Sequence, residues 1–568
     1  MKSTADRDRL VLELHDQLAE IEGRLIPIGL HVFGRPAESE ERADLLRMIA
    51  SFDRPEHGAR SLPKTVAAAF GIDCYEDLSR QLASETRELV DGIVKEAIET
   101  FCERGAEAAA DFLKSRAGID ADSVRPSFQL LSKISEQLDQ NPELDSLTRA
   151  LRGEYIEPGP GADLVQNPQV LPTGRNTHAV NPYSVPSAAA VIRAQRTAEA
   201  LLERFRDEHG RYPRCLAMVL WGLDNIKTQG EGVAQALWLL GVRPIRDRLN
   251  RATDVEIIPL AELKRPRIDI VMTVSGIFRD LFAPTMALLD KAVRQVAQLH
   301  EPFEMNYLRR NTLEKVETGG ASFDEAVTRV FSNAPGNYGA NVNFMVMQSA
   351  WEEEATLGDL FVARKCFAYT RDSEGHSVEG REAPDLMSEA LARVEATYQN
   401  IDSFEVGITD VDHYFEYLGG ISKAVETRAK SRPAIYLSDS LAPQTRIRSL
   451  EETVRLETRT KTLNPKWFEG MLKHGFRGVA EIEGHVTNTF GWSATANAVD
   501  PWIYTEIART FLLDEEMFDR LRELNRYSLE ALAKRLLEAH ERGYWNPDED
   551  VLERLRGIVE SLQQPLAK

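Results

Sequence analysis

Three short runs of apolar, largely β-branched residues alternate with helical stretches in the middle of this 568-residue chain. They are CLAMVLW (215–221), DVEIIPL (254–260) and RIDIVMTVSG (267–276), with helices predicted over 187–208 and from about residue 230. Runs of this kind are typical of strands in a parallel sheet that helices cover on both faces. The sequence therefore predicts an α/β fold with a Rossmann-like parallel-sheet core.

Helical regions are predicted on both sides of this core. Apolar residues recur at helical spacing over 9–25, 78–115 and 122–152, and prolines and glycines interrupt regular structure over 157–168. The length allows several domains. The predicted organisation is a mostly helical region (1–155), an α/β domain (156–300), a mixed helical and loop region that lines the active site (301–440) and a helical carboxy-terminal region (441–568).

The composition excludes some classes of function. With 90 acidic and 69 basic residues, the net charge of -21 repels polyanions, so nucleic acid is not an expected partner. The four cysteines form no C-x-x-C pair, which argues against a zinc ribbon or a disulfide framework. No signal peptide and no stretch of 18 apolar residues is visible, so we expect a cytoplasmic protein whose membrane contact, if any, is peripheral.

The chain has no recognisable nucleotide-binding motif. A G-x-x-x-x-G-K-[ST] loop is absent, and GLDNIKTQGEG (222–232) has the wrong spacing for a phosphate-binding or dinucleotide loop. If the reaction consumes ATP, another chain is expected to hydrolyse it.

The densest polar cluster is TDVDHYFEYLGG (409–420). As a helix, it would be capped by Thr409 and would end at Gly419–Gly420, a purely structural role. On the same helix, His413 would lie three residues from both Asp410 and Glu416. An imidazole flanked by carboxylates can hold a divalent ion or accept a proton. Spacing alone leaves both interpretations open.

Further candidates follow the predicted strands, because ligands of parallel sheets bind beyond the carboxyl ends of the strands. Trp221, Asp224 and Lys227 follow the first run, and Arg279 follows the third. Taken singly, Trp221 is more often a core residue, and Arg279 beside Asp280 is either a surface ion pair or a carboxylate clamp. A loop histidine such as His178 is usually solvated.

Many long blocks of the chain, in one order, resemble the large porphyrin-binding subunits of magnesium chelatases. They include LPTGRNTHAVNPYSVPSAAA (171–190), VLWGLDNIKTQGEGVAQALWLLGVRP (219–244), VFSNAPGNYGANVN (330–343), ARKCFAY (363–369), DVDHYFEYLGGI (410–421) and ETRTKTLNPKWFEGMLKHGFRGVAEIE (457–483). DVDHYFEYLGGI looks closer to the bacteriochlorophyll type than to the plant type. The related large subunits of cobaltochelatases share the scaffold, but DNIKT in the second block favours magnesium.

This resemblance implies insertion of Mg²⁺, the substrate ion, into protoporphyrin IX in (bacterio)chlorophyll biosynthesis. ATP would be hydrolysed by two partners, an AAA+ ATPase subunit and a subunit with an integrin-like domain. Alternatives are a cobaltochelatase large subunit acting on a corrin precursor, and a porphyrin-binding or regulatory protein without catalysis. The implied catalytic residues are Asp410, Asp412, His413 and Glu416, with Asp410, His413 and Glu416 as metal ligands. The implied substrate-binding residues are Arg175, His178, Trp221, Asp224, Lys227, Arg279, Asn333, Tyr338 and Asn341.

Two residues and the length depart from the family pattern. Asn311 stands where relatives usually have histidine, and Leu223 replaces the usual threonine. The resemblance covers only the carboxy-terminal part of family members about twice as long. We therefore expect either a split or shortened enzyme that needs a complementing chain, or a paralogue that has lost full activity.

Overall fold

The computed structural model describes residue 18 and residues 32–36, 39–54, 57–75, 84–161, 164–165, 167–177, 181–371, 377–403, 406–439 and 446–563. These residues form two compact units, Met1–Ala179 and Val180–Lys568. The helix predicted over 9–25 lies outside the described residues, except for Leu18.

The first unit is a helical bundle. Buried residues such as Val90, Leu113 and Phe128 form its apolar core. Its helices are α2 (Ser39–Ala50), α3 (Leu62–Ala69), α4 (Ser84–Arg104), α5 (Ala106–Ala117), α6 (Ala121–Asp139) and α7 (Glu143–Leu151), and the two-residue strands β1 (Gly159–Pro160) and β2 (Asn176–Thr177) pair in parallel.

The second unit is built on an eight-stranded sheet with the order β12-β11-β10-β3-β6-β7-β8-β9. Its parallel strands are β3 (Cys215–Leu220), β6 (Asp269–Val274), β7 (Val330–Ser332), β10 (Ala396–Ile401) and β11 (Ala434–Asp439). The strands β8 (Phe367–Arg371), β9 (Ser377–Glu382) and β12 (Ile447–Ser449) pair antiparallel, and β9 and β12 form the edges. By chain position the parallel strands run third, second, first, fourth, fifth, which is the Rossmann order. The predicted α/β fold with a Rossmann-like core is confirmed.

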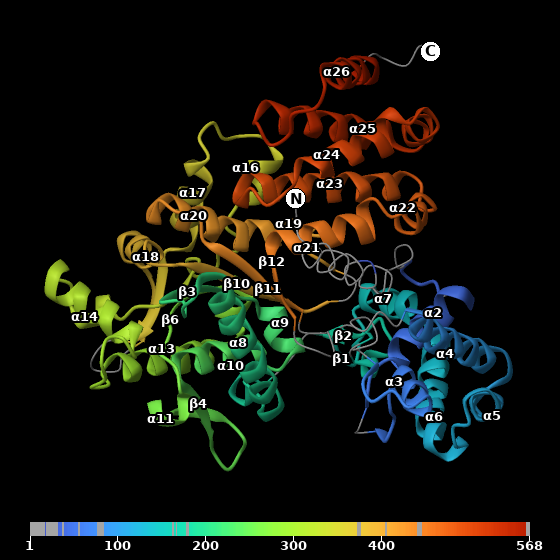
Figure 1. The fold of residues 1–568 in the computed structure, drawn as a ribbon, viewed down its shortest axis with the longest axis horizontal. Helices are drawn as coiled ribbons and strands as arrows, with labels where there is room; N and C mark the ends of the chain where they lie inside the picture. Colours follow the sequence, from blue (N-terminus) through green and yellow to red (C-terminus); the bar gives the residue numbers. More distant parts are fainter. Residues whose placement is uncertain are drawn as a thin grey trace, which may run out of the picture. The chain divides into compact units, whose positions relative to one another are not determined.

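Helices cover both faces of this sheet (Figure 1). Helices α8 (Ala188–His209), α10 (Glu231–Leu240) and α13 (Ala283–Ala297) share one apolar core with alternate residues of β3 and β6. On the opposite face, α20 (Gly420–Ala429) contacts β10 through a hydrogen bond of 2.7 Å between the hydroxyl groups of Thr397 and Ser422. Every residue of β3, β6 and β10 is buried, which explains the continuous apolar runs of β3 and β6.

The structure corrects two expectations for this unit. The run 254–260 does not join the parallel sheet, because β5 (Ala252–Ile257) pairs antiparallel with β4 (Val242–Arg246) in a separate ribbon. In β5 only Ala252 and Val255 are buried, whereas Thr253 and Glu256 are exposed, so this strand is not enclosed on both faces as the strands of a parallel sheet are. The region 281–400, expected to contain helices and loops, also contains β7, β8, β9 and β10.

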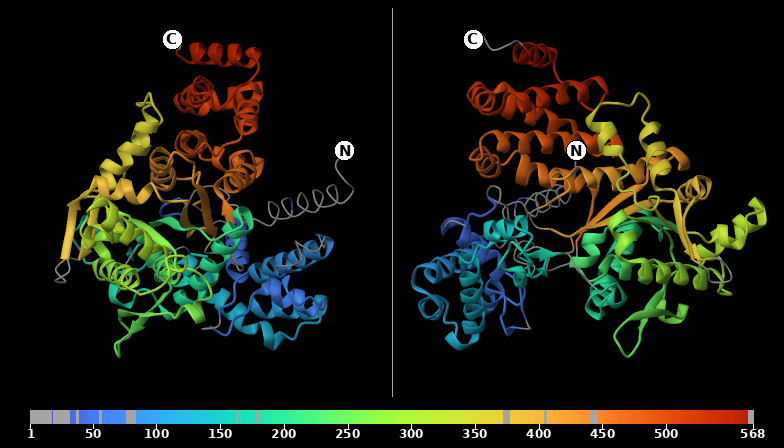
Figure 2. Two further views of the ribbon diagram at one scale, coloured as in Figure 1. Left: turned by 60° about the vertical axis from the view of Figure 1, so that its left-hand side comes forward. Right: turned by 180° about the vertical axis from the view of Figure 1, so that it is seen from behind.

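The chain ends in a stack of helices, as predicted for the carboxy-terminal region. Figure 2 shows α23, α25 and α26 lying in successive layers. The helices of the carboxy-terminal region are α21 (Leu450–Glu457), α22 (Pro465–Leu472), α23 (Phe476–Ala496), α24 (Pro501–Ala508), α25 (Glu515–Glu541) and α26 (Glu549–Gln563). Earlier in the second unit, the structure also has α9 (Gly222–Lys227), α11 (Leu260–Leu263), α12 (Gly276–Leu281), α14 (Tyr307–Gly319), α15 (Phe323–Ala326), α16 (Val342–Met347), α17 (Ala355–Lys365), α18 (Pro384–Leu391) and α19 (Asp412–Tyr414). Among the described residues, no helix is long and apolar enough to cross a membrane.

A buried ion pair fixes the amino ends of two central strands. Asp269, the first residue of β6, accepts hydrogen bonds of 2.7 and 3.0 Å from Arg329, which precedes β7. The Asn311 side chain donates to the same carboxylate at 2.8 Å. Asn311, one of the two departures from the family pattern, therefore supports the amino ends of the strands, the edge opposite to their carboxyl ends.

We expect Asp269→Ala to lower the free energy of unfolding by about 3–5 kcal/mol, because Arg329 is left buried without its counter-charge. Urea unfolding followed by tryptophan fluorescence measures this, since all seven tryptophans lie in the second unit. The control is Glu549→Ala, which removes an exposed partner of Arg556 and should cost less than about 1 kcal/mol. Equal losses in the free energy of unfolding would contradict the role of Asp269 as the counter-charge of the buried Arg329.

Candidate functional site

The strand order reverses between β3 and β10, and open parallel sheets bind ligands beyond the carboxyl ends of their strands at such a point. Trp221 follows β3, and its indole N–H donates to the Gln399 side chain of β10 at 3.2 Å. The indole ring lies 4.4 Å from the ring of Tyr417 and 6.1 Å from that of Tyr414, measured between centroids. Trp221 is therefore part of an aromatic cluster at this edge.

Asp224 and Lys227 of α9 lie at the same edge and have protein partners. Asp224 is buried and accepts a bond of 3.3 Å from the Asn400 side chain. Burial, together with the negative charge of Asp402, raises the pKa of the Asp224 carboxyl well above its usual range. Lys227 forms an ion pair of 3.1 Å with Asp402. Both residues are thus held within the protein.

His413 and Glu416 form the central pair of the site. His413 lies on α19, and Glu416 lies on the π-helical turn η5 (Phe415–Gly419) that continues it. The His413 Nδ1 atom is 2.8 Å from Oε2 of Glu416 and 3.7 Å from Oδ1 of Asp412. The Glu416 side chain is 1% exposed, whereas that of His413 is 62% exposed. A buried carboxylate therefore orients an imidazole that faces solvent.

The loop between β7 and α16 holds the other oxygen of Glu416. The backbone N–H groups of Ala340 and Asn341 both donate to its Oε1 atom. Gly339 has a φ of +71°, and a Cβ atom there would lie 3.0 Å from the same oxygen. From the next turn, the Asn343 side chain donates to Asp412 at 2.6 Å. Asn341, a predicted substrate-binding residue, thus contacts Glu416 through its backbone.

Two predicted substrate-binding residues, Asn333 and Arg279, anchor this loop. The Asn333 side chain donates to the carbonyl oxygen of Gly339 at 2.6 Å and accepts from Nζ of Lys365 at 2.9 Å. The Arg279 Nη1 atom donates to the carbonyl oxygens of Ala334 and Asn337 at 2.7 and 2.8 Å.

Tyr338 and Lys365 lie on either side of this anchoring network. The ring of Tyr338 lies 5.2 Å from the Arg279 guanidinium, and its hydroxyl donates to Asp280. Lys365 is fully buried, and burial lowers the pKa of its ammonium group well below the usual range. No feature of the sequence distinguishes Lys365 beyond its place in the ARKCFAY block.

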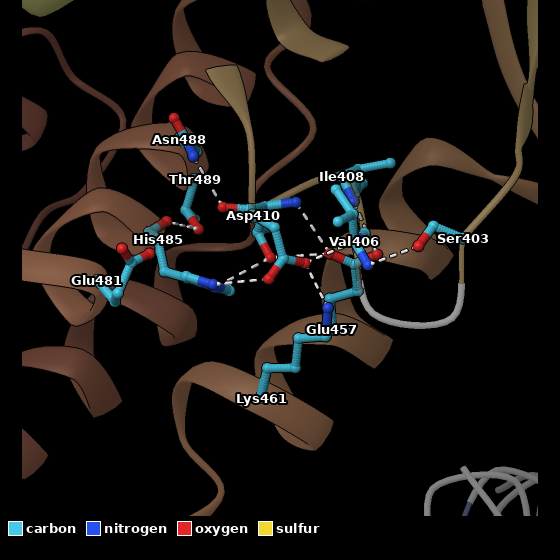
Figure 3. Close-up of polar contacts among 12 residues, drawn as sticks. Ser403, Val406, Ile408, Asp410, Glu457, Lys461, Glu481, His485, Asn488 and Thr489 are labelled. Carbon is cyan, nitrogen blue, oxygen red and sulfur yellow. Dashed lines mark hydrogen bonds and ion pairs between the residues drawn. The ribbon is translucent and has the colours of Figure 1, made fainter. Parts of the chain in front are cut away.

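Asp410 lies apart from the helical pair, in a network of its own (Figure 3). It is bonded by Lys461 of the π-helical turn η6 (Thr458–Thr462), and its Oδ1 atom is 3.0 Å from Nε2 of His485 on α23. Although burial opposes ionisation, these two groups lower the pKa of the Asp410 carboxyl below its usual range. The helix begins only at Asp412, so the prediction that Asp410 and His413 share a helix face is wrong.

Thr409 also differs from its predicted role as a helix cap. Its hydroxyl donates to the Glu457 carboxylate at 2.8 Å, which also accepts the backbone N–H groups of Ile408 and Thr409. The predicted helix end at Gly419–Gly420 is likewise wrong, because α20 starts at Gly420. A Cβ atom at Gly419 would lie 2.2 Å from the Thr495 hydroxyl oxygen, so close packing explains this glycine.

The substrate-binding roles predicted for Arg175 and His178 stay predictions. Arg175 belongs to the first unit, where its carbonyl oxygen accepts from the Gly159 N–H at 2.7 Å. His178 lies outside the described residues. Within the part of the chain that the structure describes, no group of three or more His, Cys, Asp or Glu residues has the geometry of a metal site. The metal-binding role of His413, Glu416 and Asp410 stays a prediction.

A family model described as CobN/Magnesium Chelatase matches residues 1–552. The chain belongs to this family. The chloroplastic magnesium-chelatase subunit ChlH of Oryza sativa subsp. japonica is 42% identical, covering 99% of this chain and 42% of its own length. The corresponding magnesium-chelatase protein of Cereibacter sphaeroides is 39% identical, covering 97% and 39%. These two identities do not favour the bacteriochlorophyll type over the plant type.

A solved structure supports the same assignment. The catalytic subunit of cobaltochelatase from Mycobacterium tuberculosis superposes with a TM-score of 0.92 at 33% identity, covering 99% of this chain and 47% of that chain. The family thus includes subunits named for magnesium and for cobalt. This chain spans less than half the length of each of these relatives.

The contact between Gly339 and Glu416 makes a testable prediction. Gly339→Ala adds a methyl group against Oε1 of Glu416 in a left-handed conformation, and we expect a loss of about 2–3 kcal/mol in the free energy of unfolding. Gly320→Ala is the matched control, since Gly320 has a φ of +65° and open space around it. The control should cost only about 1 kcal/mol. Equal losses of stability from the two substitutions would show that a methyl group at position 339 does not crowd Glu416.

Proposed function

We propose that this chain is the metal-inserting part of a magnesium chelatase large subunit, which binds protoporphyrin IX and receives Mg²⁺. The names of its relatives support the reaction class. The observation that carries the proposal is the pair of the solvent-facing His413 and the buried Glu416, in the unit built on a Rossmann-like sheet.

Insertion of a metal ion into a porphyrin requires acceptance of the two pyrrole N–H protons. The bond between Nδ1 of His413 and Glu416 fixes the tautomer in which Nε2 carries the free lone pair. This hydrogen bond also raises the pKa of the His413 imidazole. His413 is therefore positioned to take a proton from the macrocycle near neutral pH.

The carboxylates beside His413 suit a magnesium ion. Mg²⁺ prefers hard oxygen ligands and loses its water reluctantly, so one or two carboxylates usually bind it together with water. Asp412 and Glu416 are the carboxylates within reach of the imidazole. In this proposal Asp412 receives the ion while His413, oriented by Glu416, removes protons.

The energy for dehydrating the ion is assigned to partners. The sequence contains no phosphate-binding loop. We assign ATP hydrolysis to an AAA+ ATPase subunit that works with a subunit carrying an integrin-like domain. A polypeptide equivalent to the rest of the relatives' length would complete the macrocycle site.

Insertion of cobalt into a corrin precursor is the second candidate, supported by the similarity to the cobaltochelatase catalytic subunit. A regulatory porphyrin-binding protein without catalysis is the third. Binding titrations with a porphyrin and a corrin separate the first two, and turnover separates both from the third.

We expect His413→Ala and Glu416→Gln each to slow metalloporphyrin formation by about 10²–10⁴-fold, because the proton acceptor or its orienting carboxylate is lost. The assay combines this chain with the ATPase subunits and the complementing polypeptide, and follows absorbance. His300→Ala is the control, since His300 is exposed and outside the site. Undiminished rates in both site variants would refute the proposed role.

The pH dependence of the rate gives a second test. As a base, His413 must be neutral, so the rate rises as pH increases through the pKa of His413. Glu416 raises that pKa, and Glu416→Gln should therefore move the rise towards lower pH, near the ordinary histidine value of about 6.5. A profile that moves towards higher pH, or does not move, would contradict this assignment.

A further inference from the structure

Three basic side chains, those of Lys365, Arg279 and Arg364, lie near Tyr417, beside the loop that holds Glu416. Nζ of Lys365 lies 4.3 Å from the centre of this ring. The positive charges of Arg279 and Arg364 act on both Lys365 and Tyr417. In a chain with a net charge of -21, this is an unusual concentration of positive charge.

Carboxylates only partly neutralise this cluster. Arg279 forms an ion pair of 2.7 Å with Asp280. Lys365 donates to neutral oxygens, the carbonyl of Val274 and the side chain of Asn333, both at 2.9 Å. Glu416 is the nearby carboxylate that acts on Lys365, but its oxygens already accept bonds from the loop and from His413.

Arg364 has no counter-ion among the described residues. It is half-buried in the last turn of α17, and within the described residues its guanidinium forms no ion pair and no hydrogen bond. Its buried Nε atom and the buried Nη2 atom of Arg279 both lack partners in this part of the chain. Leaving guanidinium donors buried and unpaired costs free energy, so such groups are expected to meet an anion.

The surface next to this cluster is apolar. Tyr338, which stacks on Arg279, is 54% exposed, and its ring packs against Gly276 at the start of α12. Ile277 and Leu281 of α12 are 40% and 44% exposed, four residues apart on one face of the helix. The side chain of Phe344 on α16 is exposed one residue after Asn343, which holds Asp412. Exposed apolar surface of this kind marks ligand or protein contacts.

Apolar surface beside excess positive charge fits a planar apolar molecule that carries carboxylates. We propose that Arg364, backed by the guanidinium of Arg279, binds a propionate carboxylate of the macrocycle while the ring lies over the exposed apolar residues. This inference rests on the proposed function, because it assigns one contact of the same substrate. Arg364 contacts the carboxylate directly, whereas Lys365 is fully buried and does not reach it.

Titrations of the chain with protoporphyrin IX and with its dimethyl ester test this assignment through quenching of tryptophan fluorescence. The ester keeps the ring and removes both negative charges. We expect Arg364→Met to weaken binding of the free acid roughly 10- to 100-fold, as for loss of a charged hydrogen bond, and to leave binding of the ester unchanged. Arg364→Lys should recover part of the loss, since it restores the charge without the planar fork.

Arg556→Met is the matched control, because Arg556 is an exposed arginine paired with Glu549 on α26. It should bind both ligands as the unsubstituted chain does. Equal binding of acid and ester, or equal affinities of Arg364→Met and the unsubstituted chain for the acid, would overturn the proposal. If neither ligand binds the unsubstituted chain, the proposed macrocycle binding itself fails, which is a distinct result.

Discussion

The burial of the Glu416 carboxylate is the interaction on which the site depends. One oxygen is bonded by two backbone N–H groups of the loop after β7, and the other holds His413. A carboxylate that is 1% exposed is stable only with such partners. Gly339 leaves space for the carboxylate, because it has no side chain. Asn333, which accepts a hydrogen bond from Lys365, holds the loop by donating to the carbonyl oxygen of Gly339. The orientation of the His413 imidazole therefore depends on the contacts that hold Glu416.

The fold explains why these parts meet. The parallel strands place the ends of β3, β6, β7 and β10 at one edge, and the residues that follow each strand contribute side chains there. The π-helical turn η5 adds Tyr417 and Glu416 to the same edge, whereas η6 carries Lys461 towards Asp410. Such turns often occur at functional sites, because they displace side chains from regular helical positions.

The sequence predicted the sheet where its strands are continuously apolar, as in β3 and β6. It did not predict β10, because ATYQNI buries threonine, glutamine and asparagine that are satisfied by partners far along the chain, such as Ser422 and Trp221. The pairing of His413 with Glu416 was visible as a spacing of three residues. The partners of Asp410 were not, since Lys461 and His485 are brought to it only by tertiary packing. The sequence did not predict roles for Lys365 and Arg364 either, because their neighbours are also brought together only by tertiary packing.

The role of this chain in metal insertion can be tested directly by following absorbance. The assay combines the unsubstituted chain with the remaining polypeptide and the ATPase subunits. Protoporphyrin IX with Mg²⁺ and a corrin precursor with Co²⁺ are offered in parallel. We expect ATP-dependent formation of magnesium protoporphyrin and no cobalt corrin. Formation of cobalt corrin alone, or binding of porphyrin without turnover in the complete mixture, would contradict it.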